Sequence, residues 1–381
     1  MASAQGGINV AIIGVGLVGS SVISQLLTVP TLASRLHIVA LQNSKKTLLN
    51  NPASPISLAP PADWKALLAN SATSALALPD LVKELVKITQ QSGRHTAVVD
   101  NTSDETVAQF YPEFLKAGLS VVTPNKKAFS GSLQLYQQIQ QLKTNQNAGS
   151  TGPLVYQEST VGAGLPIIGT LNDLVTTGDE VTKIEGVFSG TLSYIFNEFS
   201  TPKGGDAKFS EIVKVAKENG YTEPHPDDDL NGSDVARKLA ILSRLVPSLS
   251  GSLEQGYLSV PTRSLTPAPL ASVKSGDEYV QRLPEFDADF TALNQEAAKE
   301  GSVLRYVGVI DVVKGEIKAS LEKYPASHPF ASSLSGSDNI VAFHTKRYNA
   351  RPLLVQGAGA GADVTAMGVV ADLVRVAERR G

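Results

Sequence analysis

The stretch Ile8-Asn9-Val10-Ala11-Ile12-Ile13-Gly14-Val15-Gly16-Leu17-Val18-Gly19 decides how the chain begins to fold. A short apolar run predicts a buried strand, the glycines predict a tight turn, and the apolar periodicity through Leu27 predicts a helix. In this context the first glycine permits the turn, the second lets a pyrophosphate approach, and the third lets the helix pack on the strand. The helix start adds amide donors for phosphate. The pattern favours a dinucleotide-binding turn over a plain glycine turn, with these cofactor contacts: Gly14, Gly16, Leu17, Val18 and Gly19.

The alternation of strand and helix continues outward from this turn. The sequence predicts strands at Leu36–Leu41, Ala97–Asp100 and Leu119–Val122, and helices at Leu78–Gln91 and Asp104–Ala117. Strands that alternate with helices imply right-handed crossovers and a parallel sheet. We therefore expect an α/β protein with a Rossmann-type, doubly wound parallel sheet.

The second half of the chain has a different pattern. A polar stretch, residues 143–153, marks a boundary, and residues 303–355 alternate as in an antiparallel sheet. The last segment opens with Gly357-Ala358-Gly359-Ala360-Gly361 and continues as an amphipathic helix, which we expect to return to the first domain. This predicts a discontinuous dinucleotide-binding domain and an α+β substrate-binding domain with a mixed or antiparallel sheet. The expected limits are residues 1–155 with 356–381 for the first domain, and residues 156–355 for the second.

Composition excludes several classes of protein. A net charge of -3 gives no electrostatic support for a nucleic-acid or anionic-membrane partner. The absence of cysteine excludes disulfides, thiolate-bound metals and the thioester chemistry of aldehyde dehydrogenases. No segment is apolar over the roughly 18 residues that a bilayer span needs. We expect a cytosolic protein.

The acidic run Gly220–Lys238 is the most informative stretch for chemistry. It holds five carboxylates in a proline-stiffened loop and a helix start, followed by a lysine. Asp234 and Lys238 are spaced i, i+4, so they share one face of a helix. The carboxylates suit a cationic ligand, and a lysine beside a carboxylate can move protons. A solvated acidic turn that caps a helix explains the same residues equally well.

Cofactor choice depends on the end of the second strand. An Asp or Glu is usual there in NAD-specific sites, but this chain has Asn43, with Lys45 and Lys46 close behind. A neutral amide and two lysines favour binding of the 2′-phosphate of NADP, although NAD use stays open. The alternative is that the two lysines are ordinary surface charges with no role in cofactor binding. Two loops at the carboxyl ends of later strands are expected at the same crevice. They carry Thr102 and Ser103, beside the nicotinamide, and Lys126.

Two further segments leave alternatives open. The loop Tyr156–Pro166 has little side-chain bulk, so it can turn carbonyls around a hard cation with Glu158 nearby, or serve as a close-packed hinge. Gly190 and Thr191 follow a predicted strand, where free amides suit a substrate carboxylate or carbonyl. A simple N-cap by Ser189 is the alternative.

Together these motifs resemble the monofunctional homoserine dehydrogenase family along nearly the whole chain. The matching strings are Gly14–Gly19, Asp100–Ser103, Pro124–Phe129, Glu158–Pro166, Ile184–Thr191, Gly220–Lys238 and Gln356–Gly361. The resemblance implies NAD(P)H-dependent, reversible reduction of L-aspartate 4-semialdehyde to L-homoserine, a step toward threonine and methionine. It also implies a homodimer, with dimerisation through the second domain.

The resemblance assigns roles by position. Lys238 matches the proton-donating lysine, Asp234 the carboxylate beside it, and Lys126 a second lysine at the reacting centre. The implied substrate contacts are Glu223, Asp229, Gly190 and Thr191; the implied sodium ligands are Glu158, Val161, Ala163 and Leu165; Gly361 adds an amide near the cofactor. The family commonly has an acid near Asn43, so this departure puts strict NAD dependence in doubt. Asp227 and Asp228 are expected to face solvent, and His225 has no assigned role.

Two other functions fit parts of the sequence. One is an NAD(P)-dependent dehydrogenase of another small hydroxy or amino acid, although the five histidines are scattered and none sits in the context of a lactate-type site. The other is a non-catalytic regulator that senses a dinucleotide. A regulator needs the glycine turn but not the acidic run with its lysine.

Overall fold

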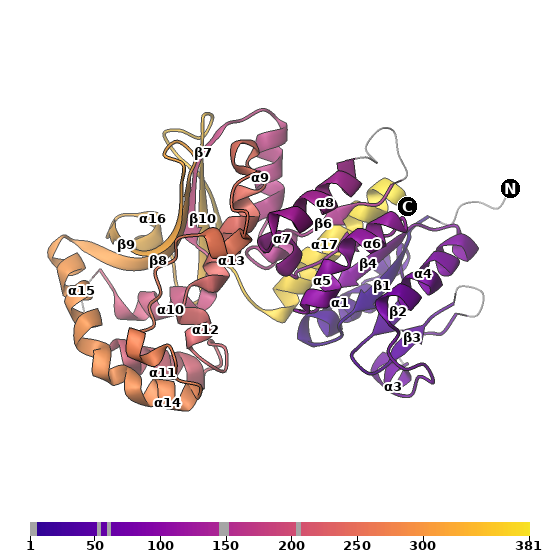
Figure 1. Cartoon of the computed structure of the whole chain (residues 1–381), viewed down its shortest axis with the longest axis horizontal. Helices are drawn as coiled ribbons and strands as arrows, with labels where there is room; N and C mark the ends of the chain where they lie inside the picture. Colours follow the sequence, from indigo (N-terminus) through magenta and orange to yellow (C-terminus); the bar gives the residue numbers. More distant parts are fainter. Residues whose placement is uncertain (1–5, 52–54, 59–61, 145–151, 203–206) are drawn as a thin grey trace. The chain divides into compact units, whose positions relative to one another are not determined.

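The protein is described from a computed structural model, which gives the structure of residues 6–51, 55–58, 62–144, 152–202 and 207–381. The chain forms two compact units (Figure 1). The first comprises Met1–Gly164 and Gly361–Gly381, and the second comprises Leu165–Ala360. Most of the polar stretch 143–153 lies outside the described residues, and the functional division expected from the sequence stays a prediction. Within the described ranges, no helix has both the length and the apolar character needed to cross a membrane.

A six-stranded sheet in the order β3-β2-β1-β4-β5-β6 forms the centre of the first unit. Its strands are β1 (Ile8–Ile13), β2 (Leu36–Gln42), β3 (Thr47–Leu49), β4 (Thr96–Asp100), β5 (Ser120–Val122) and β6 (Val155–Tyr156). All neighbours are parallel except β2 and β3, which form an antiparallel edge. Every residue of β1 is buried, as expected of a central parallel strand. The predicted doubly wound fold is confirmed.

The helices of the first unit include those predicted from the sequence, one of which is divided in two, and several that were not predicted. They are α1 (Leu17–Thr28), α2 (Pro30–Ala33), α3 (Trp64–Ala69), α4 (Leu78–Ser92), α5 (Glu105–Gln109), α6 (Tyr111–Lys116), α7 (Lys127–Ser130), α8 (Leu133–Thr144) and α17 (Ala362–Arg380), with a short 3-10 turn, η1 (Glu158–Thr160). The single helix expected at residues 104–117 is wrong: α5 ends at Gln109 and α6 starts at Tyr111. Pro112 lies in the first turn of α6, where its missing N–H and its ring cannot continue the preceding helix.

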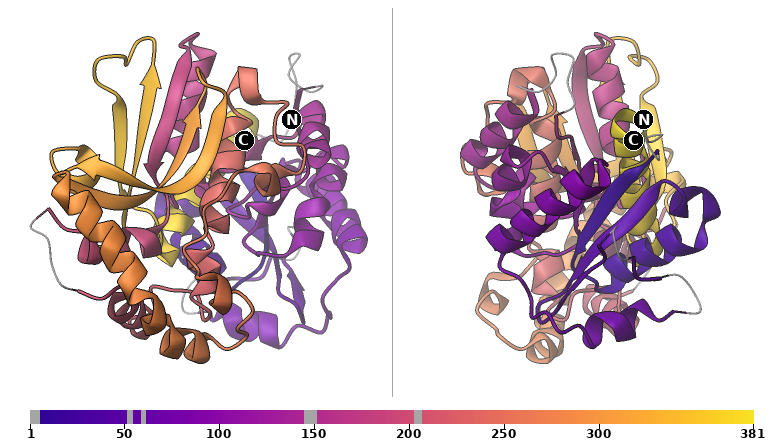
Figure 2. Two further views of the ribbon diagram at one scale, coloured as in Figure 1. Left: turned by 60° about the vertical axis from the view of Figure 1, so that its left-hand side comes forward. Right: turned by 90° about the vertical axis from the view of Figure 1, so that its right-hand side faces the viewer.

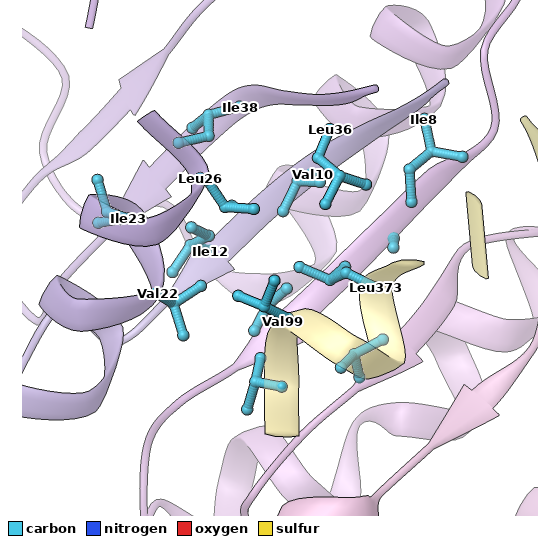
Figure 3. Close-up of a cluster of buried hydrophobic side chains, with 14 of the residues drawn as sticks. Ile8, Val10, Ile12, Val22, Ile23, Leu26, Leu36, Ile38, Val99 and Leu373 are labelled. Carbon is cyan, nitrogen blue, oxygen red and sulfur yellow. The ribbon is translucent and has the colours of Figure 1, made fainter. Parts of the chain in front are cut away.

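The last helix completes the core of the first unit. Ala366, Val369, Leu373 and Val376 of α17 are at most 1% exposed and belong to the same apolar cluster as the sheet residues. Figure 3 shows Leu373 among side chains of the sheet and of α1. At its far end, a Cβ atom on Gly381 would approach the backbone nitrogen of Gly7 to 3.1 Å. Segments from both ends of the chain therefore build one core.

The second unit is built on a five-stranded antiparallel sheet in the order β11-β10-β7-β8-β9 (Figures 1 and 2). Its strands are β7 (Val181–Val187), β8 (Ser302–Asp311), β9 (Glu316–Pro325), β10 (Asp338–Thr345) and β11 (Leu353–Ala358). The alternation predicted for residues 303–355 is confirmed as β8 to β11. The central strand, β7, comes from much earlier in the chain, and its Glu185 lies opposite both Val309 and Ala342.

Helices cover the two faces of this sheet unequally. The helices are α9 (Ile167–Thr176), α10 (Gly190–Phe199), α11 (Phe209–Glu218), α12 (Asp227–Leu230), α13 (Ser233–Ser243), α14 (Gly276–Arg282), α15 (Asp287–Lys299) and α16 (Pro329–Ser332). A Cβ on Gly308 of β8 would lie 2.7 Å from Leu239, so α13 packs closely on that face. The alternate residues Val307 and Val309 face the other way and pack with Phe330 of the four-residue α16. The opposite face therefore has a much shorter helix on it than α13.

Candidate active site

The glycine turn after β1 has the close contacts that its sequence predicts. Gly14 is in the left-handed region at φ 86°, and a Cβ there would lie 2.7 Å from Cγ2 of Thr102. A Cβ on Gly19 would lie 2.0 Å from the carbonyl oxygen of Gly14, so only glycine permits this packing of helix on strand. Gly16 has no atom within 4 Å of the position that a side chain would take. The side chain of Val18 packs against the core, so what it offers a ligand is its backbone.

The start of α1 offers an anion site that the protein's own side chains do not fill. Gly16 at the N-cap has no side chain to cap the helix, no acid lies in the first turn, and Leu17 is 84% exposed. The amide of Asn101 is buried near Gly19, and neither its nitrogen nor its oxygen has a hydrogen-bond partner within the described residues. Such groups are costly unless a ligand satisfies them. The open helix start and this amide fit a dinucleotide, and sequence reasoning did not single out Asn101. Gly361, the N-cap residue of α17 in the same unit, has φ 121°.

The residues after β2 form one compact turn. The side-chain oxygen of Asn43 accepts the backbone N–H groups of Lys45 at 2.8 Å and Lys46 at 2.7 Å. The ammonium of Lys46 donates to the carbonyl oxygen of Ser71 at 2.7 Å. Of the two lysines, Lys45 is therefore the better candidate to meet a cofactor phosphate, because Lys46 already binds a carbonyl.

A buried carboxylate joins the two loops that follow β4 and β5. Asp100 is 0% exposed and accepts the N–H and the hydroxyl of Thr102 at 2.9 and 2.6 Å. Its other oxygen accepts the hydroxyl of Tyr111 at 2.6 Å and the amide of Asn125 at 3.0 Å. The hydroxyl of Thr123 donates to the Asp100 carbonyl at 2.7 Å. One side chain thus fixes both loops.

This network holds the predicted cofactor residues in place. Thr102 precedes the exposed Ser103, and Asn125 precedes Lys126, the N-cap residue of α7. Burial raises the pKa of Asp100, although the hydrogen bonds from Thr102, Tyr111 and Asn125 oppose that rise. The sequence places Thr102, Ser103 and Lys126 at a ligand crevice, but it does not reveal the carboxylate beneath them.

The loop Glu158–Leu165 is tightly constrained. Glu158 is 4% exposed, its carboxylate lies 3.3 Å from the guanidinium of Arg375, and its N–H donates to Asp372 at 2.9 Å. Burial raises the pKa of Asp372 to about 7. Ala163 is in the left-handed region at φ 55°.

These contacts fit a bound cation only in part. No group of three or more His, Cys, Asp or Glu side chains suited to a metal occurs within the described residues. The carbonyl of Leu165 accepts the N–H of Ile167 at 2.8 Å, and Glu158 pairs with Arg375. The left-handed conformation of Ala163 allows a sharp turn that can expose backbone carbonyls to a cation, and Val161, two residues earlier, is wholly buried.

A buried lysine and its carboxylate lie on α13. Lys238 is 6% exposed, and its ammonium lies 2.7 Å from the Asp234 carboxylate and donates to the carbonyl of Phe188 at 2.6 Å. The shared helix face expected from the i, i+4 spacing is thus observed. Gly232 just before the helix has φ 78°, and a Cβ there would lie 2.0 Å from the hydroxyl of Tyr306. The close packing under the helix start therefore depends on glycine.

The predicted substrate residues lie in the same unit as this lysine. Gly190 and Thr191 are the first two residues of α10. The N-cap by Ser189, the alternative considered for this segment, is present, because the Ser189 hydroxyl accepts a hydrogen bond from the Leu192 N–H at 3.2 Å. The N–H of Glu223 donates to the carboxylate of Asp229 at 2.8 Å.

Burial and neighbouring acids together change the pKa of Asp229. Burial raises the pKa of Asp229 to about 6, the hydrogen bond from the Glu223 backbone N–H lowers it, and the charges of Glu223 and Asp234 add to the rise. The structure therefore brings Thr191, Glu223, Asp229 and Asp234 together. Lys126 lies in the first unit and Lys238 in the second.

Residues 264–279 contact the acidic loop and hold it in place. Asp228 is exposed as expected, but the expectation for Asp227 is wrong, because its carboxylate accepts the hydroxyl of Thr266 at 2.6 Å. His225 contacts the ring of Tyr279 and meets the Val273 carbonyl at 3.1 Å. These residues connect the loop to residues 264–279, a role that no local sequence pattern announces.

Comparison with known proteins extends these observations. The sequence model described as "Homoserine dehydrogenase" matches residues 166–374, and the one described as "Homoserine dehydrogenase, NAD binding domain" matches residues 14–150. The homoserine dehydrogenase of Saccharomyces cerevisiae is 48% identical over 372 residues, which cover 98% of each chain.

Solved structures give the same picture. A Candida auris protein, described as of unknown function, matches with a TM-score of 0.87 and 45% identity over 98% of this chain and 99% of that one. A hyperthermophilic archaeal homoserine dehydrogenase mutant in complex with NADPH matches with a TM-score of 0.69 and 22% identity over 98% of both chains. The second likeness concerns the fold alone.

Proposed function

The chain belongs to the homoserine dehydrogenase family, and from that premise we propose which of its residues carry the reaction. The protein is an NAD(P)-dependent oxidoreductase that acts on a CH–OH group, interconverting L-aspartate 4-semialdehyde and L-homoserine. Bound NAD(P)H supplies the hydride that reduces the aldehyde carbon. The residues of the chain must then orient the substrate and deliver a proton to the aldehyde oxygen.

Lys238 is our candidate for the proton donor, and its buried position carries this proposal. The ammonium is held between the Asp234 carboxylate and the Phe188 carbonyl, at 2.7 and 2.6 Å, so its direction is fixed before substrate arrives. Negative charge grows on the aldehyde oxygen as the carbon is reduced. A fixed ammonium in a buried site stabilises that charge and donates a proton. Asp234 holds the lysine, and Lys126 is the second lysine that we assign to the reacting centre.

The substrate's two charged ends are assigned to opposite kinds of partner. Glu223 and Asp229 are the candidate partners of its ammonium, since both are acids and the Asp229 carboxylate accepts a 2.8 Å hydrogen bond from the Glu223 backbone N–H. The backbone amides of Gly190 and Thr191 at the start of α10 are the candidate partners of a carboxylate or carbonyl. Opposite charges at the two ends allow only one orientation of a small amino acid.

The test is NADPH oxidation with aspartate semialdehyde. Lys238→Met keeps the buried stem but removes the ammonium, and we expect kcat to fall at least about a hundredfold, the usual contribution of a general acid. Lys214→Met removes a lysine of an exposed ion pair with Glu218 and should leave kcat unchanged. No turnover by the wild-type protein overturns the activity, and near-normal turnover by Lys238→Met overturns the role of the lysine.

We further propose that the cofactor is preferably NADP(H). Asn43 brings no negative charge to the turn after β2, and Lys45 lies in that turn with its N–H bonded to Asn43. Titration with NADPH and NADH should show tighter NADPH binding, and Lys45→Glu should reverse the order. Lys116→Glu is a control, because Lys116 ends α6 just before β5, which is separated from β2 by β1 and β4 in the sheet. Equal affinities for both cofactors would contradict the proposal.

A monovalent cation, sodium, is our proposed occupant of the loop Glu158–Leu165. The candidate ligands are Glu158, Val161, Ala163 and Leu165, and the left-handed turn at Ala163 supports carbonyl ligation. Thermal unfolding in sodium chloride, compared with choline chloride at equal ionic strength, tests it. Equal unfolding temperatures would contradict sodium binding, whatever the activity does.

We propose that the protein is a homodimer that associates through the sheet of the second unit. On the sheet face that carries Val307 and Val309, the helix that contributes to the apolar cluster within the described residues is the four-residue α16. Light scattering during size-exclusion chromatography should give twice the chain mass of 40.1 kDa. A mass of one chain at micromolar concentration would contradict the dimer.

The cellular role follows from the activity. We propose that the enzyme works in the cytoplasm and supplies homoserine for threonine and methionine. Expression of the chain in a homoserine-requiring strain should restore growth without threonine and methionine, and Lys238→Met should not. A fluorescent fusion that localises to an organelle would contradict the cytoplasmic assignment.

A further inference from the structure

The carbonyl oxygen that holds Lys238 is shared with a second side chain. Phe188 lies between β7 and the start of α10, and its carbonyl accepts the Lys238 ammonium at 2.6 Å. The same oxygen accepts the side-chain amide of Asn339 at 3.0 Å. A carbonyl has two lone pairs, so one can face the lysine and the other the asparagine.

Asn339 is itself closely confined. It belongs to β10, lies opposite Gly357 of β11, and is 1% exposed. A Cβ on Gly359 would lie 2.0 Å from the Asn339 amide nitrogen, so the side chain lies directly against the backbone of that glycine. The amide therefore has little freedom to turn away from Phe188.

The side-chain oxygen of Asn339 is buried and lacks a hydrogen-bond donor within the described residues. A buried acceptor without a donor destabilises a fold, and an apolar side chain of similar shape would avoid that cost. A residue that costs stability beside the proton donor is better explained by function than by packing.

We propose that Asn339 is a positioning residue for Lys238. Its amide fixes the direction of the Phe188 carbonyl, and that carbonyl fixes the ammonium. Ser189, the next residue, caps α10, where Gly190 and Thr191 begin. That cap holds the start of α10, and Asn339 acts on the proton donor through the Phe188 carbonyl. The inference rests on the proposed role of Lys238 and goes beyond it.

The decisive variant is Asn339→Leu, which keeps the branching of the side chain and removes both the donor and the unsatisfied acceptor. We expect kcat to fall about tenfold, equivalent to about 1.4 kcal/mol of transition-state stabilisation. The KM for aspartate semialdehyde and the Kd for NADPH should change by less than about twofold, because these groups do not bind either ligand. The unfolding temperature should stay the same or rise. If the leucine does not fit, Asn339→Ala is measured in the same way.

A matched control separates positioning from general stability. The amide of Asn294 also donates to a phenylalanine carbonyl, that of Phe199, at 3.0 Å in the same unit. Asn294→Leu should lower the unfolding temperature and leave kcat unchanged. Adding Asn339→Leu to Lys238→Met should cause no further loss, since Asn339 acts through the lysine.

Each outcome has one meaning. Wild-type kcat in a folded Asn339→Leu or Asn339→Ala variant overturns the positioning role, as does a further loss in the Lys238→Met background. If Lys238→Met itself keeps its activity, the assignment of the proton donor fails. An inactive Lys238→Met with a normal Asn339→Leu overturns only the present inference.

Discussion

Removing a single hydroxyl, with Tyr111→Phe, tests whether Asp100 holds the loops after β4 and β5 together. Tyr111 is 0% exposed, and its hydroxyl donates to the Asp100 carboxylate at 2.6 Å. The aromatic ring stays in place, so packing against Phe129 is kept. A hydrogen bond to a charged group contributes about 1.5–3 kcal/mol, and no water replaces the lost donor in a wholly buried site. We therefore expect the variant to be about 2 kcal/mol less stable.

Urea unfolding followed by tryptophan fluorescence measures this loss. Trp64 is the single tryptophan and lies in the same unit, packed against its core. The difference from wild type should be larger at neutral pH than in acid, because the tyrosine hydroxyl lowers the pKa of Asp100 by stabilising its ionised form. Once Asp100 is protonated, the variant loses only a hydrogen bond between neutral groups, which contributes about 1 kcal/mol to stability. The Kd for NADPH should rise, since the loop that carries Thr102 loosens.

The control is Tyr156→Phe in the same unit. The hydroxyl of Tyr156 is buried and has no hydrogen-bond partner within the described part of the chain. Its removal should be neutral or slightly stabilising. The prediction is refuted if Tyr111→Phe is as stable as Tyr156→Phe. It is also refuted if Tyr111→Phe loses the same free energy of unfolding at every pH, because an ionised Asp100 would then not hold the two loops together.

Three other measurements test the site and its frame. Because burial raises the pKa of Asp229 to about 6, kcat/KM for aspartate semialdehyde, whose ammonium group Asp229 is proposed to bind, should rise as pH increases through 6. Asp229→Asn should remove that rise, and an unchanged profile would count against the ammonium contact. Gly19→Ala should weaken NADPH binding at least about tenfold or prevent folding, since its Cβ would lie 2.0 Å from the Gly14 carbonyl; calorimetry with wild-type affinity would show that the turn adapts. Burial alone would raise the pKa of Glu185, but hydrogen bonds, chiefly from His344, hold it at about 2. Glu185→Gln should therefore cost roughly 3 kcal/mol at neutral pH and almost nothing near pH 2, as urea unfolding at both pH values would reveal.

Features of the fold that depend on residues close together in the chain could be predicted from the sequence. The strand Ile8–Ile13 is fully buried, so its apolar run and the glycines after it identify it without ambiguity. Asp234 and Lys238 are one helical turn apart, so their spacing alone brings them together. The pattern at 104–117 misled because its apolar period continues across Pro112, while the backbone cannot.

Contacts between distant segments were not predictable. Asp100 meets Asn125 and Asn339 meets Phe188 over separations of 25 and 151 residues, and no periodicity records such pairs. The bracing of Asp227 by Thr266 is of the same kind, because the partner segment has no motif of its own. Charge-rich loops therefore reveal which groups are present, whereas the polar partners that orient them emerge only from the fold.

The dependence of the first unit on α17 has a consequence for biosynthesis. When a ribosome has made residues 1–360, it has made the whole second unit but only part of the first. The sheet then lacks Val369, Leu373 and Val376, which fill its core in the finished protein. The nascent nucleotide-binding unit must keep apolar surface exposed until its last helix leaves the exit tunnel. We expect this unit to mature last and to be the part of the newly made chain that most needs chaperones.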